Sequence, residues 1–354
     1  MRKPSGRSRV TRFSFAIISA VLRTSPSVLI VRLDALGDAV ALVPLIHALA
    51  SAQMPPSVVL LPQNAEIFSP QALQHIEVAH FALRNDTPAN KRAIRAMGRS
   101  LAVRDYSAAL IATEDPAGYR LARDAGIATR IGFENGLGKP LKTLWVRRLC
   151  TQTIRRSAGL DPKAPHECEV LFELVRPLLP AAIPSHDPAL LRRYLIEGPR
   201  APADAIAMQV TDKWMRIGAT FDAVIQVARA IAKRSPARFV AAASESAFTQ
   251  LFVEATHFEV ESFASLQPWK AAIDSARAIV APDSGAIHIA GMVGTPAVPV
   301  FAAQHFRVQS RRWSPWAAPF HAVRIEETWP LVALDALDEL LSAAPVRTSA
   351  LYKG

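Results

Sequence analysis

The chain has 354 residues and half of them are apolar, so it is long enough for two domains and too hydrophobic to be generally disordered. Lysine and arginine outnumber aspartate and glutamate by 41 to 30. This excess suits phosphate-rich partners, among them nucleic acid, anionic lipid and nucleotide sugars, without choosing among them. Cys150 and Cys168 lack the spacing of a zinc site or a disulfide framework, and we interpret them as free thiols in a cytosolic protein.

Much of the positive charge lies in a basic N-terminal extension, residues 1–26, which contains no acidic residue. Its short apolar run, residues 13–22, cannot span a bilayer, which needs about twenty apolar residues. Two interpretations remain open, a basic amphipathic anchor on the inner membrane surface and a disordered or mis-started extension. A signal peptide is less favoured, because no small-x-small cleavage site follows the apolar run.

The first half of the chain alternates strand and helix patterns. Residues 27–33 are β-branched and aliphatic, which is typical of a strand buried on both faces of a parallel sheet. A turn at 34–38, an apolar helix over 39–50 and a strand over 58–61 then predict a right-handed β-α-β unit. The alternation continues with helices over 90–104 and 118–125 and strands over 108–112 and 129–133. It predicts a doubly wound α/β domain.

Four prolines within residues 176–188 indicate a linker, and we place a domain boundary near residue 185. The alternation then resumes, so a second domain of the same kind is expected, with ligands at the carboxyl ends of both sheets. The predicted strands are 205–209, 239–243, 278–281 and 297–301, and the predicted helices are 220–233, 247–255, 266–276, 286–293 and 331–341. The predicted divisions are the extension 1–26, an N-terminal domain 27–185, a C-terminal domain 186–330, and a C-terminal helix and tail 331–354.

Residues 279–290 (IVAPDSGAIHIA) predict a strand, a tight turn and the start of a helix. Asp283 and Ser284 stand where a helix N-cap belongs. The backbone N–H groups that follow can bind an anion, and Gly285 lets a phosphate approach the backbone. His288 lies one helical turn further and can face the same space. Plain capping of a buried helix explains the spacing equally well.

Residues 34–39 (DALGDA) have the same layout in the first half. Gly37 permits an unusual backbone angle or the close approach of a ligand. Asp34 and Asp38 flank it, and a carboxylate at Asp38 can act as general base toward a hydroxyl within about 3 Å. On spacing alone, a cap without chemistry is slightly favoured.

Together, these two segments resemble glycosyltransferase family 9, the lipopolysaccharide heptosyltransferase family. Its N-terminal signature is a strand, a short turn, Gly-Asp and an apolar helix with a proline, which residues 28–49 (VLIVRLDALGDAVALVPLIHAL) match, with Pro44 in place. Its C-terminal signature is matched by residues 283–301 (DSGAIHIAGMVGTPAVPVF). The resemblance extends over about residues 27–330.

The resemblance implies a GT-B fold, in which two Rossmann-like α/β domains face each other across a cleft. It also implies an inverting displacement, in which an acceptor hydroxyl attacks the anomeric carbon of an ADP-heptose-like donor. By position, Asp38 matches the general base, and Asp34 and Gly37 belong to its turn at the cleft. The positions that match donor contacts are Lys213 at the phosphates, Glu245 near the nucleoside, and Asp283, Ser284, Gly285 and His288 in the donor loop.

Two turns depart from the family pattern. The Pro-Gly-Ser/Ala turn expected before the lysine reads MQVT at residues 208–211, and the Gly-Gly expected before the glutamate reads Ala242-Ala243. Both changes remove positions where a backbone can approach a phosphate or ribose closely. A catalytically lapsed relative, which binds a sugar nucleotide or glycan without transfer, is therefore the alternative to an active enzyme.

We thus predict a cytoplasmic glycosyltransferase, with contact to the inner face of the membrane left open, acting on a lipopolysaccharide-core or other surface glycan. A basic nucleic-acid or membrane binder is the rival that the charge suggests, although we expect no nucleic-acid partner. Without Asp-x-Asp, P-loop or G-x-G-x-x-G motifs, we predict no metal and no cofactor besides the donor. Residues 166–169 (HECE) fit an acceptor-side or structural role better than a metal site. A basic helix can meet acceptor phosphates or be a solvated face, and its residues are Lys91, Arg92, Arg95 and Arg99.

Overall fold

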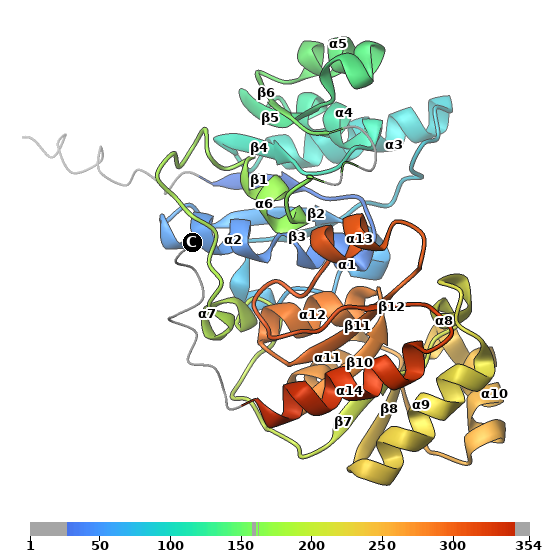
Figure 1. Ribbon diagram of the computed structural model, residues 1–354. Coiled ribbons are helices and arrows are strands. Elements are labelled where there is room, and N and C mark those ends of the chain that lie inside the picture. Colours follow the sequence, from blue (N-terminus) through green and yellow to red (C-terminus); the bar gives the residue numbers. More distant parts are fainter. Residues whose placement is uncertain (1–26, 158–160, 162, 344–354) are drawn as a thin grey trace, which may run out of the picture.

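The protein forms two α/β lobes, each built on a six-stranded parallel sheet (Figure 1). The computed structural model describes residues 27–157, 161 and 163–343. The predicted N-terminal extension and its anchor therefore lie outside the described residues. Within the described residues, no helix is long and apolar enough to cross a membrane. The two predicted doubly wound domains are confirmed.

The sheet of the N-terminal lobe has the strand order β3-β2-β1-β4-β5-β6. Every pair of neighbours is parallel, and β1 is central and completely buried, as its aliphatic sequence predicts. The strands are β1 (Val28–Val31), β2 (Pro56–Leu60), β3 (Ile76–Val78), β4 (Ala108–Ile111), β5 (Thr129–Glu134) and β6 (Gln152–Arg155).

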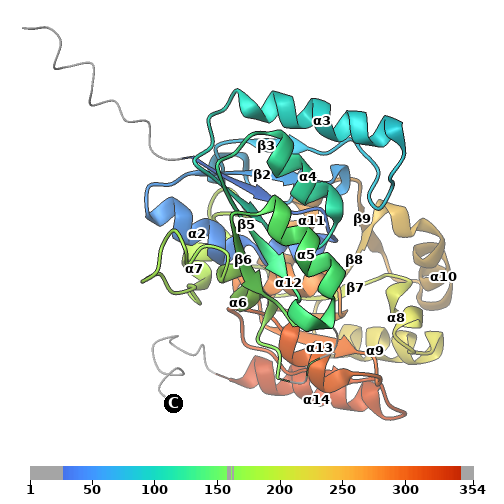
Figure 2. The same cartoon turned by 90° about the horizontal axis from the view of Figure 1, so that it is seen from above.

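Helices cover both faces of this sheet (Figure 2). The predicted helix over residues 39–50 is in fact two helices, because Pro44 lacks an N–H and is accommodated only in the first turn of a new helix. The first of them contains Gly37 and Asp38. The helical segments are α1 (Leu36–Val40), α2 (Val43–Ser51), η2 (Pro62–Asn64), η3 (Pro70–Ala72), α3 (Pro88–Ala102), α4 (Pro116–Asp124), η4 (Gly136–Gly138), α5 (Pro140–Leu149), α6 (Glu167–Phe172) and α7 (Pro188–Arg192).

The C-terminal lobe repeats this plan with the strand order β12-β11-β10-β7-β8-β9. The terminal helix packs against β10, β11 and α9, so it belongs to this lobe. The strands are β7 (Ile206–Gln209), β8 (Ala237–Ala242), β9 (Val260–Phe263), β10 (Ala278–Pro282), β11 (Ala297–Phe301) and β12 (Val323–Arg324). The helical segments are α8 (Lys213–Arg216), α9 (Phe221–Arg234), η5 (Ala243–Glu245), α10 (Ser246–Thr256), α11 (Leu266–Ser275), α12 (Gly285–Val293), α13 (Phe306–Arg312) and α14 (Trp329–Ser342).

One apolar core runs through the contact between the lobes. It joins side chains of α1, α2 and α6 with side chains of α11 and α12. The two helices that begin within the sequence motifs, α1 and α12, pack directly against each other. The carboxyl ends of β1 and β10, which precede these helices, therefore face one another, as the cleft prediction requires.

A second contact between the lobes depends on a buried lysine. Lys270 on α11 is 0% exposed, and its Nζ donates hydrogen bonds to the carbonyl oxygens of Glu66 at 2.9 Å and Ile67 at 2.6 Å. Burial lowers the pKa of Lys270 to about 7, although the negative charges of Glu66 and Glu197 oppose this shift. Lys270 therefore loses its proton at a lower pH in the folded protein than in the unfolded chain.

We expect the wild type to gain stability relative to a Lys270→Met variant as the pH rises from about 7 toward the ordinary lysine range. In that window the unfolded chain retains the lysine proton while the folded chain has lost it, so the free energy of unfolding rises by up to ~1.4 kcal/mol per pH unit. Urea unfolding of both proteins at several pH values measures this difference. The exposed Lys233→Met is the control, and a wild-type advantage that stays constant with pH would contradict the prediction.

Candidate active site

The two sequence motifs meet through their glycines. A Cβ atom added to Gly37 would lie 2.3 Å from Cδ2 of His288, and one added to Gly285 would lie 2.3 Å from Cδ2 of Leu36. Each glycine is therefore covered by a side chain from the other lobe. The close approach of a phosphate to Gly285 stays a prediction, and in the structure this glycine also leaves room for Leu36.

Asp38 is held by hydrogen bonds to both carboxylate oxygens. Nη2 of Arg32 donates to Oδ1 at 2.7 Å, and the N–H of Ala35 donates to Oδ2 at 3.2 Å. The side chain remains 24% exposed. Because each carboxylate oxygen has two lone pairs, Asp38 can still accept a proton from a hydroxyl that approaches from the exposed side. Asp38 can therefore cap the turn and also serve as a proton acceptor.

Asp34 shares the same arginine. Its Oδ2 lies 3.4 Å from Nε of Arg32, and the Asn64 amide donates to its backbone carbonyl at 2.8 Å. Burial raises the pKa of Asp34, and the positive charge of Arg32 opposes the rise. The turn therefore presents two carboxylates in different environments on either side of Gly37.

His288 lies at the junction of the two lobes. Burial lowers its pKa, the charges of Asp283 and Asp38 oppose this shift, and Lys213 adds to it. These three side chains are therefore close enough for their charges to act on the same ring. The ring also stands edge-on to Trp313, with centroids 5.5 Å apart. The structure thus brings the first motif against His288 of the second, and the charge of Lys213 acts on the same buried ring.

The N-terminus of α12 faces this junction without a side-chain cap. Ser284 occupies the N-cap position, as predicted, but its hydroxyl donates to Oε1 of Gln209 at 2.5 Å instead of bonding the helix. The first N–H groups of an uncapped helix carry partial positive charge. This end of α12 can accept a phosphate or another anion.

Glu245 organises the glycine-poor turn before Lys213. Its Oε1 accepts a hydrogen bond from the Thr211 hydroxyl at 2.8 Å, and its Oε2 accepts one from the N–H of Asp212 at 3.0 Å. The same Thr211 hydroxyl accepts from the N–H of Lys213 at 3.2 Å. The acidic side chain next to Lys213 in the sequence, Asp212, pairs with Arg216 at 2.5 Å. Threonine and glutamate side chains thus shape the turn that lacks glycine.

A buried charge network, which the sequence did not predict, lies beside Asp38. Glu167 at the start of α6 is 0% exposed and receives hydrogen bonds from Arg156 at 2.9 Å and from Arg312 at 2.7 Å. Arg32 is 3.6 Å from the same carboxylate. Burial alone would raise the pKa of Glu167, but these guanidinium groups hold it below its ordinary value. Arg312 comes from the C-terminal lobe, so the network joins the lobes.

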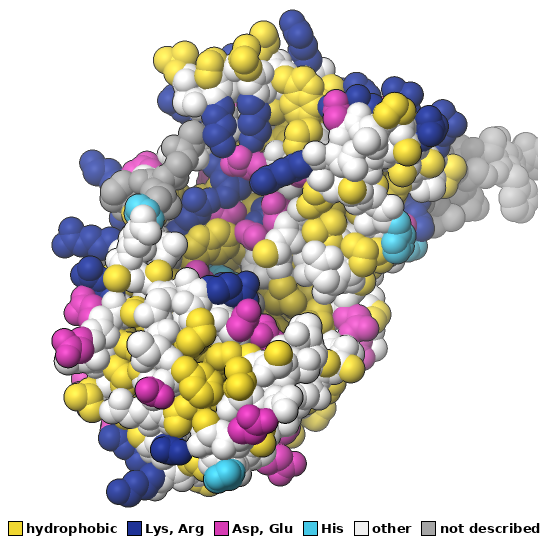
Figure 3. Space-filling view, turned by 90° about the vertical axis from the view of Figure 1, so that its right-hand side faces the viewer, with side chains coloured by type: hydrophobic (Ala, Val, Ile, Leu, Met, Phe, Trp, Pro, Cys, Tyr) yellow, Lys and Arg dark blue, Asp and Glu magenta, His cyan; other side chains and the backbone are white. Residues whose placement is uncertain are grey.

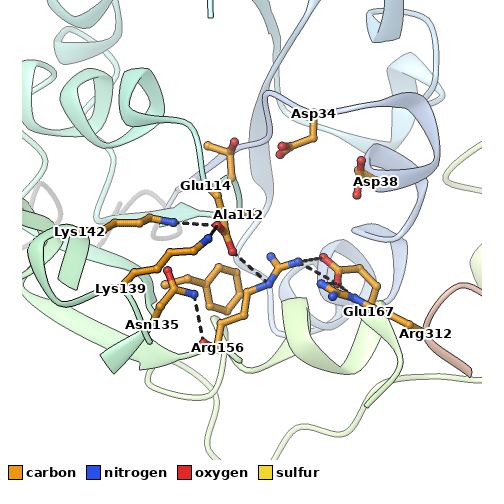
Figure 4. Close-up of polar contacts among 12 residues, drawn as sticks. Asp34, Asp38, Ala112, Glu114, Asn135, Lys139, Lys142, Arg156, Glu167 and Arg312 are labelled. Atoms are coloured by element: carbon orange, nitrogen blue, oxygen red, sulfur yellow. Dashed lines mark hydrogen bonds and ion pairs between the residues drawn. The ribbon is translucent and has the colours of Figure 1, made fainter. Parts of the chain in front are cut away.

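The network continues as a row of charges along the N-terminal lobe. Glu114 lies 2.8 Å from Nζ of Lys142 and 3.5 Å from both Lys139 and Arg156. These cations lower the pKa of Glu114 to about 2, against the effect of burial. Figure 4 shows the row in place, with Asp34 and Asp38 on its far side. In Figure 3, charged side chains gather in the hollow between the two lobes.

His166 has a structural position. Its Nδ1 accepts from the N–H of Cys168 at 3.1 Å, which caps α6, and its Nε2 donates to the carbonyl of Ser314 at 2.8 Å. Burial lowers its pKa to about 4, so the ring is neutral at physiological pH. Across the described residues, no group of three or more His, Cys, Asp or Glu side chains is arranged to hold a metal ion.

Solved structures with the same fold are known. The chain superimposes on a glycosyltransferase family 9 protein from Veillonella parvula with a TM-score of 0.69 and 12% identity, covering 90% of this chain and 97% of that one. It superimposes on E. coli ADP-heptose lps heptosyltransferase II with a TM-score of 0.65 and 15% identity, covering 89% and 98%. For E. coli heptosyltransferase WaaC with ADP, the values are 0.63, 16%, 89% and 99%. The predicted GT-B fold is confirmed.

The sequence of the second lobe also matches a known family. The sequence model of glycosyltransferase family 9 (heptosyltransferase) matches residues 239–340, which include the motif at Asp283–His288. No curated protein sequence matches the chain. The resemblance to family 9 is thereby confirmed, and the protein is a glycosyltransferase.

Proposed function

We propose that this chain transfers a heptose-like sugar, with inversion, from an ADP-linked donor to a hydroxyl of a lipopolysaccharide-core or similar surface-glycan acceptor. The observation that carries the proposal is the contact of α1 with α12. It brings Asp38 within electrostatic reach of His288, Asp283 and Lys213. One proton acceptor and several phosphate-binding groups thus surround the same space.

The donor belongs on the C-terminal lobe, residues 186–330. The N-terminus of α12, which has no side-chain cap, and the ammonium of Lys213, whose charge acts on His288, suit the binding of a diphosphate. As the bond to the sugar breaks, negative charge grows on the departing diphosphate, and these groups stabilise it. Glu245 acts through the turn it organises, because both of its carboxylate oxygens bond to Thr211 and Asp212. Two E. coli neighbours were solved with ADP or an ADP-linked heptose, which supports an ADP-linked donor.

The acceptor belongs on the N-terminal lobe, residues 27–185. Its hydroxyl attacks the anomeric carbon while Asp38 takes the proton, so the new bond forms opposite the departing diphosphate. Lys139, Lys142 and Arg156 belong to the row of charges around Glu114, and such cations suit an acceptor that carries phosphate or carboxylate groups. On the basic helix α3, Lys91 instead pairs with Asp86 at 2.9 Å, and Arg92, Arg95 and Arg99 are exposed.

Thermal unfolding with ADP, UDP and GDP tests the donor assignment. We expect ADP to raise the midpoint most, because a ligand that binds only the folded state stabilises it. The change Lys213→Ala should weaken ADP binding about ten- to hundredfold, the effect of losing one hydrogen bond to a charged group. Titration calorimetry with ADP measures that loss directly.

The control is Lys233→Ala, which removes an exposed lysine from the far end of α9 and should leave ADP affinity unchanged. Equal affinity of wild type and Lys213→Ala would remove Lys213 from the donor site. The catalytically lapsed alternative is motivated by the glycine-poor turn at residues 208–211. It would be favoured if the protein bound ADP yet transferred no sugar from ADP-heptose to an extract of core glycans.

A further inference from the structure

The segment η4–α5, residues 136–149, exposes three leucines on the N-terminal lobe. Leu137, Leu141 and Leu144 are 91%, 83% and 53% exposed. Scattered exposed leucines are ordinary, but three within one short segment form a local apolar surface. Leu141 and Leu144, three residues apart on α5, project on one side of this helix, while Val146 and Leu149 are buried. Leu137 lies in the preceding turn η4 and lines one cavity together with Leu144. We call Leu137, Leu141 and Leu144 the leucine ridge.

The surroundings of the leucine ridge are basic. Between Glu134 and Asp161 the sequence contains six lysines and arginines and no acidic residue. Arg148 is exposed on α5, and Arg155 lines a cavity of 400 Å³ together with Leu137 and Leu144. Arg147 lines the same cavity and pairs there with Glu134. Exposed leucines beside cations match a surface whose outer layer is anionic and whose interior is apolar. A nucleic acid would match the cations but leave the leucines in water.

We propose that the leucine ridge and the cations around it dock this glycosyltransferase on an anionic phospholipid membrane. The ridge inserts among the lipid head groups, and Arg148 and its basic neighbours pair with lipid phosphates. In Figure 1, α5 lies at the end of the N-terminal lobe farthest from the C-terminal lobe, so this contact leaves the second lobe clear of the bilayer. At the top of Figure 3, hydrophobic side chains lie on the surface with basic side chains beside and below them.

This docking explains how a lipid-linked acceptor reaches the site, a consequence that rests on the proposed function. Lys139 and Lys142 belong to the same segment as the leucine ridge, and both reach Glu114 in the row of charges beside Asp38. An acceptor anchored in the same membrane would thus find its phosphate-binding groups next to the docking surface. The membrane-binding test needs neither donor nor acceptor, so its failure is separable from a failure of the proposed transfer.

Vesicle co-sedimentation of the full chain tests the proposal. The probes are vesicles of phosphatidylethanolamine with about one quarter phosphatidylglycerol, and vesicles of phosphatidylcholine alone. The wild type should bind the anionic vesicles more tightly than the neutral ones. The triple change Leu137→Ser, Leu141→Ser and Leu144→Ser should weaken binding to anionic vesicles by about tenfold or more.

The matched control changes three exposed apolar residues of the C-terminal lobe, Leu251→Ser, Leu331→Ser and Val332→Ser, which are 54%, 57% and 48% exposed. It should bind within about twofold of the wild type, because single exposed residues away from the contact contribute little. Unchanged binding of the leucine-ridge variant would overturn the proposal, as would an equal loss in the control. Preferred binding to RNA over anionic vesicles would overturn it in favour of a nucleic-acid surface.

A second measurement avoids dependence on the triple variant. The native thiols Cys150 and Cys168 are buried, so a Leu141→Cys variant can be labelled selectively with an environment-sensitive fluorophore. Its emission should shift to shorter wavelength on adding anionic vesicles, whereas the same label at Leu331→Cys should not respond. Identical emission with and without vesicles at position 141 would rule out insertion of the leucine ridge.

Discussion

Replacement of Asp38 by asparagine is expected to slow sugar transfer by about 10²- to 10⁴-fold, the usual effect of losing a general base. Asparagine keeps an oxygen that can accept from the N–H of Ala35, but it cannot take up the acceptor proton. ADP binding should persist, because the proposed phosphate-binding groups belong to the other lobe. The transfer rate at saturating donor and the ADP-induced thermal shift measure the two effects separately.

The neighbouring change Asp34→Asn is the matched control. It alters a carboxylate on the same turn that shares Arg32, and it should slow transfer by less than about tenfold, because no base is removed. A larger loss in Asp34→Asn than in Asp38→Asn would move the role of base to Asp34. A fully active Asp38→Asn enzyme would end the assignment.

The second large effect is expected from Glu167→Gln. Three guanidinium groups surround this carboxylate at 0% exposure, and removing its charge weakens the electrostatic pairing of all three. Arg32 keeps its contacts with Asp34 and Asp38, and Arg156 stays near Glu114. Loss of one partner from a buried ionic group costs about 3–5 kcal/mol of folding free energy. Urea unfolding at neutral pH measures this loss of stability. Sugar transfer by the variant should also slow, because Arg32 contacts the carboxylates of both Glu167 and Asp38.

The pH dependence separates lost charge from altered packing. The folded pKa of Glu167 lies below its ordinary value, so its stabilisation is present above the unfolded pKa and is lost as the pH falls through the folded pKa. The wild type should therefore approach the Glu167→Gln variant in stability in acid. As a control, Glu173→Gln breaks an exposed pair with Arg176 and should change stability by less than about 1 kcal/mol. A Glu167→Gln effect as small as that of the control would contradict the prediction.

The strands and helices that the sequence predicted correctly are those with long aliphatic or amphipathic patterns, such as β1 and α9. The elements it missed have weaker patterns. Strand β6 is only half-buried or exposed along its length, and α5 is basic with leucines on its outer side, so neither shows the periodicity of a buried element. Strand β12 has only two residues, and it is recognised as a strand only through its pairing with β11.

The candidate site was predictable where its residues are local in sequence and was not where they are distant. Asp38 and His288 belong to compact motifs, whereas Glu167 is stabilised by arginines contributed from three separate parts of the chain. One signal was available, because Arg32 interrupts an otherwise aliphatic strand, and a charge buried in such a strand needs a partner. The role of Glu245 was assigned by resemblance, and only the structure reveals its bonds to the turn.

Because each glycine is covered by a side chain of the other motif, substitutions in the two motifs depend on each other. Gly37 has room only for hydrogen because His288 covers it, and Gly285 is restricted in the same way by Leu36. A larger residue at either glycine requires a smaller or displaced side chain in the opposite lobe, so substitutions at these paired positions have non-additive effects. A variant library should therefore accept changes at Gly37 mainly together with changes at His288, which makes the contact detectable as pairwise covariation.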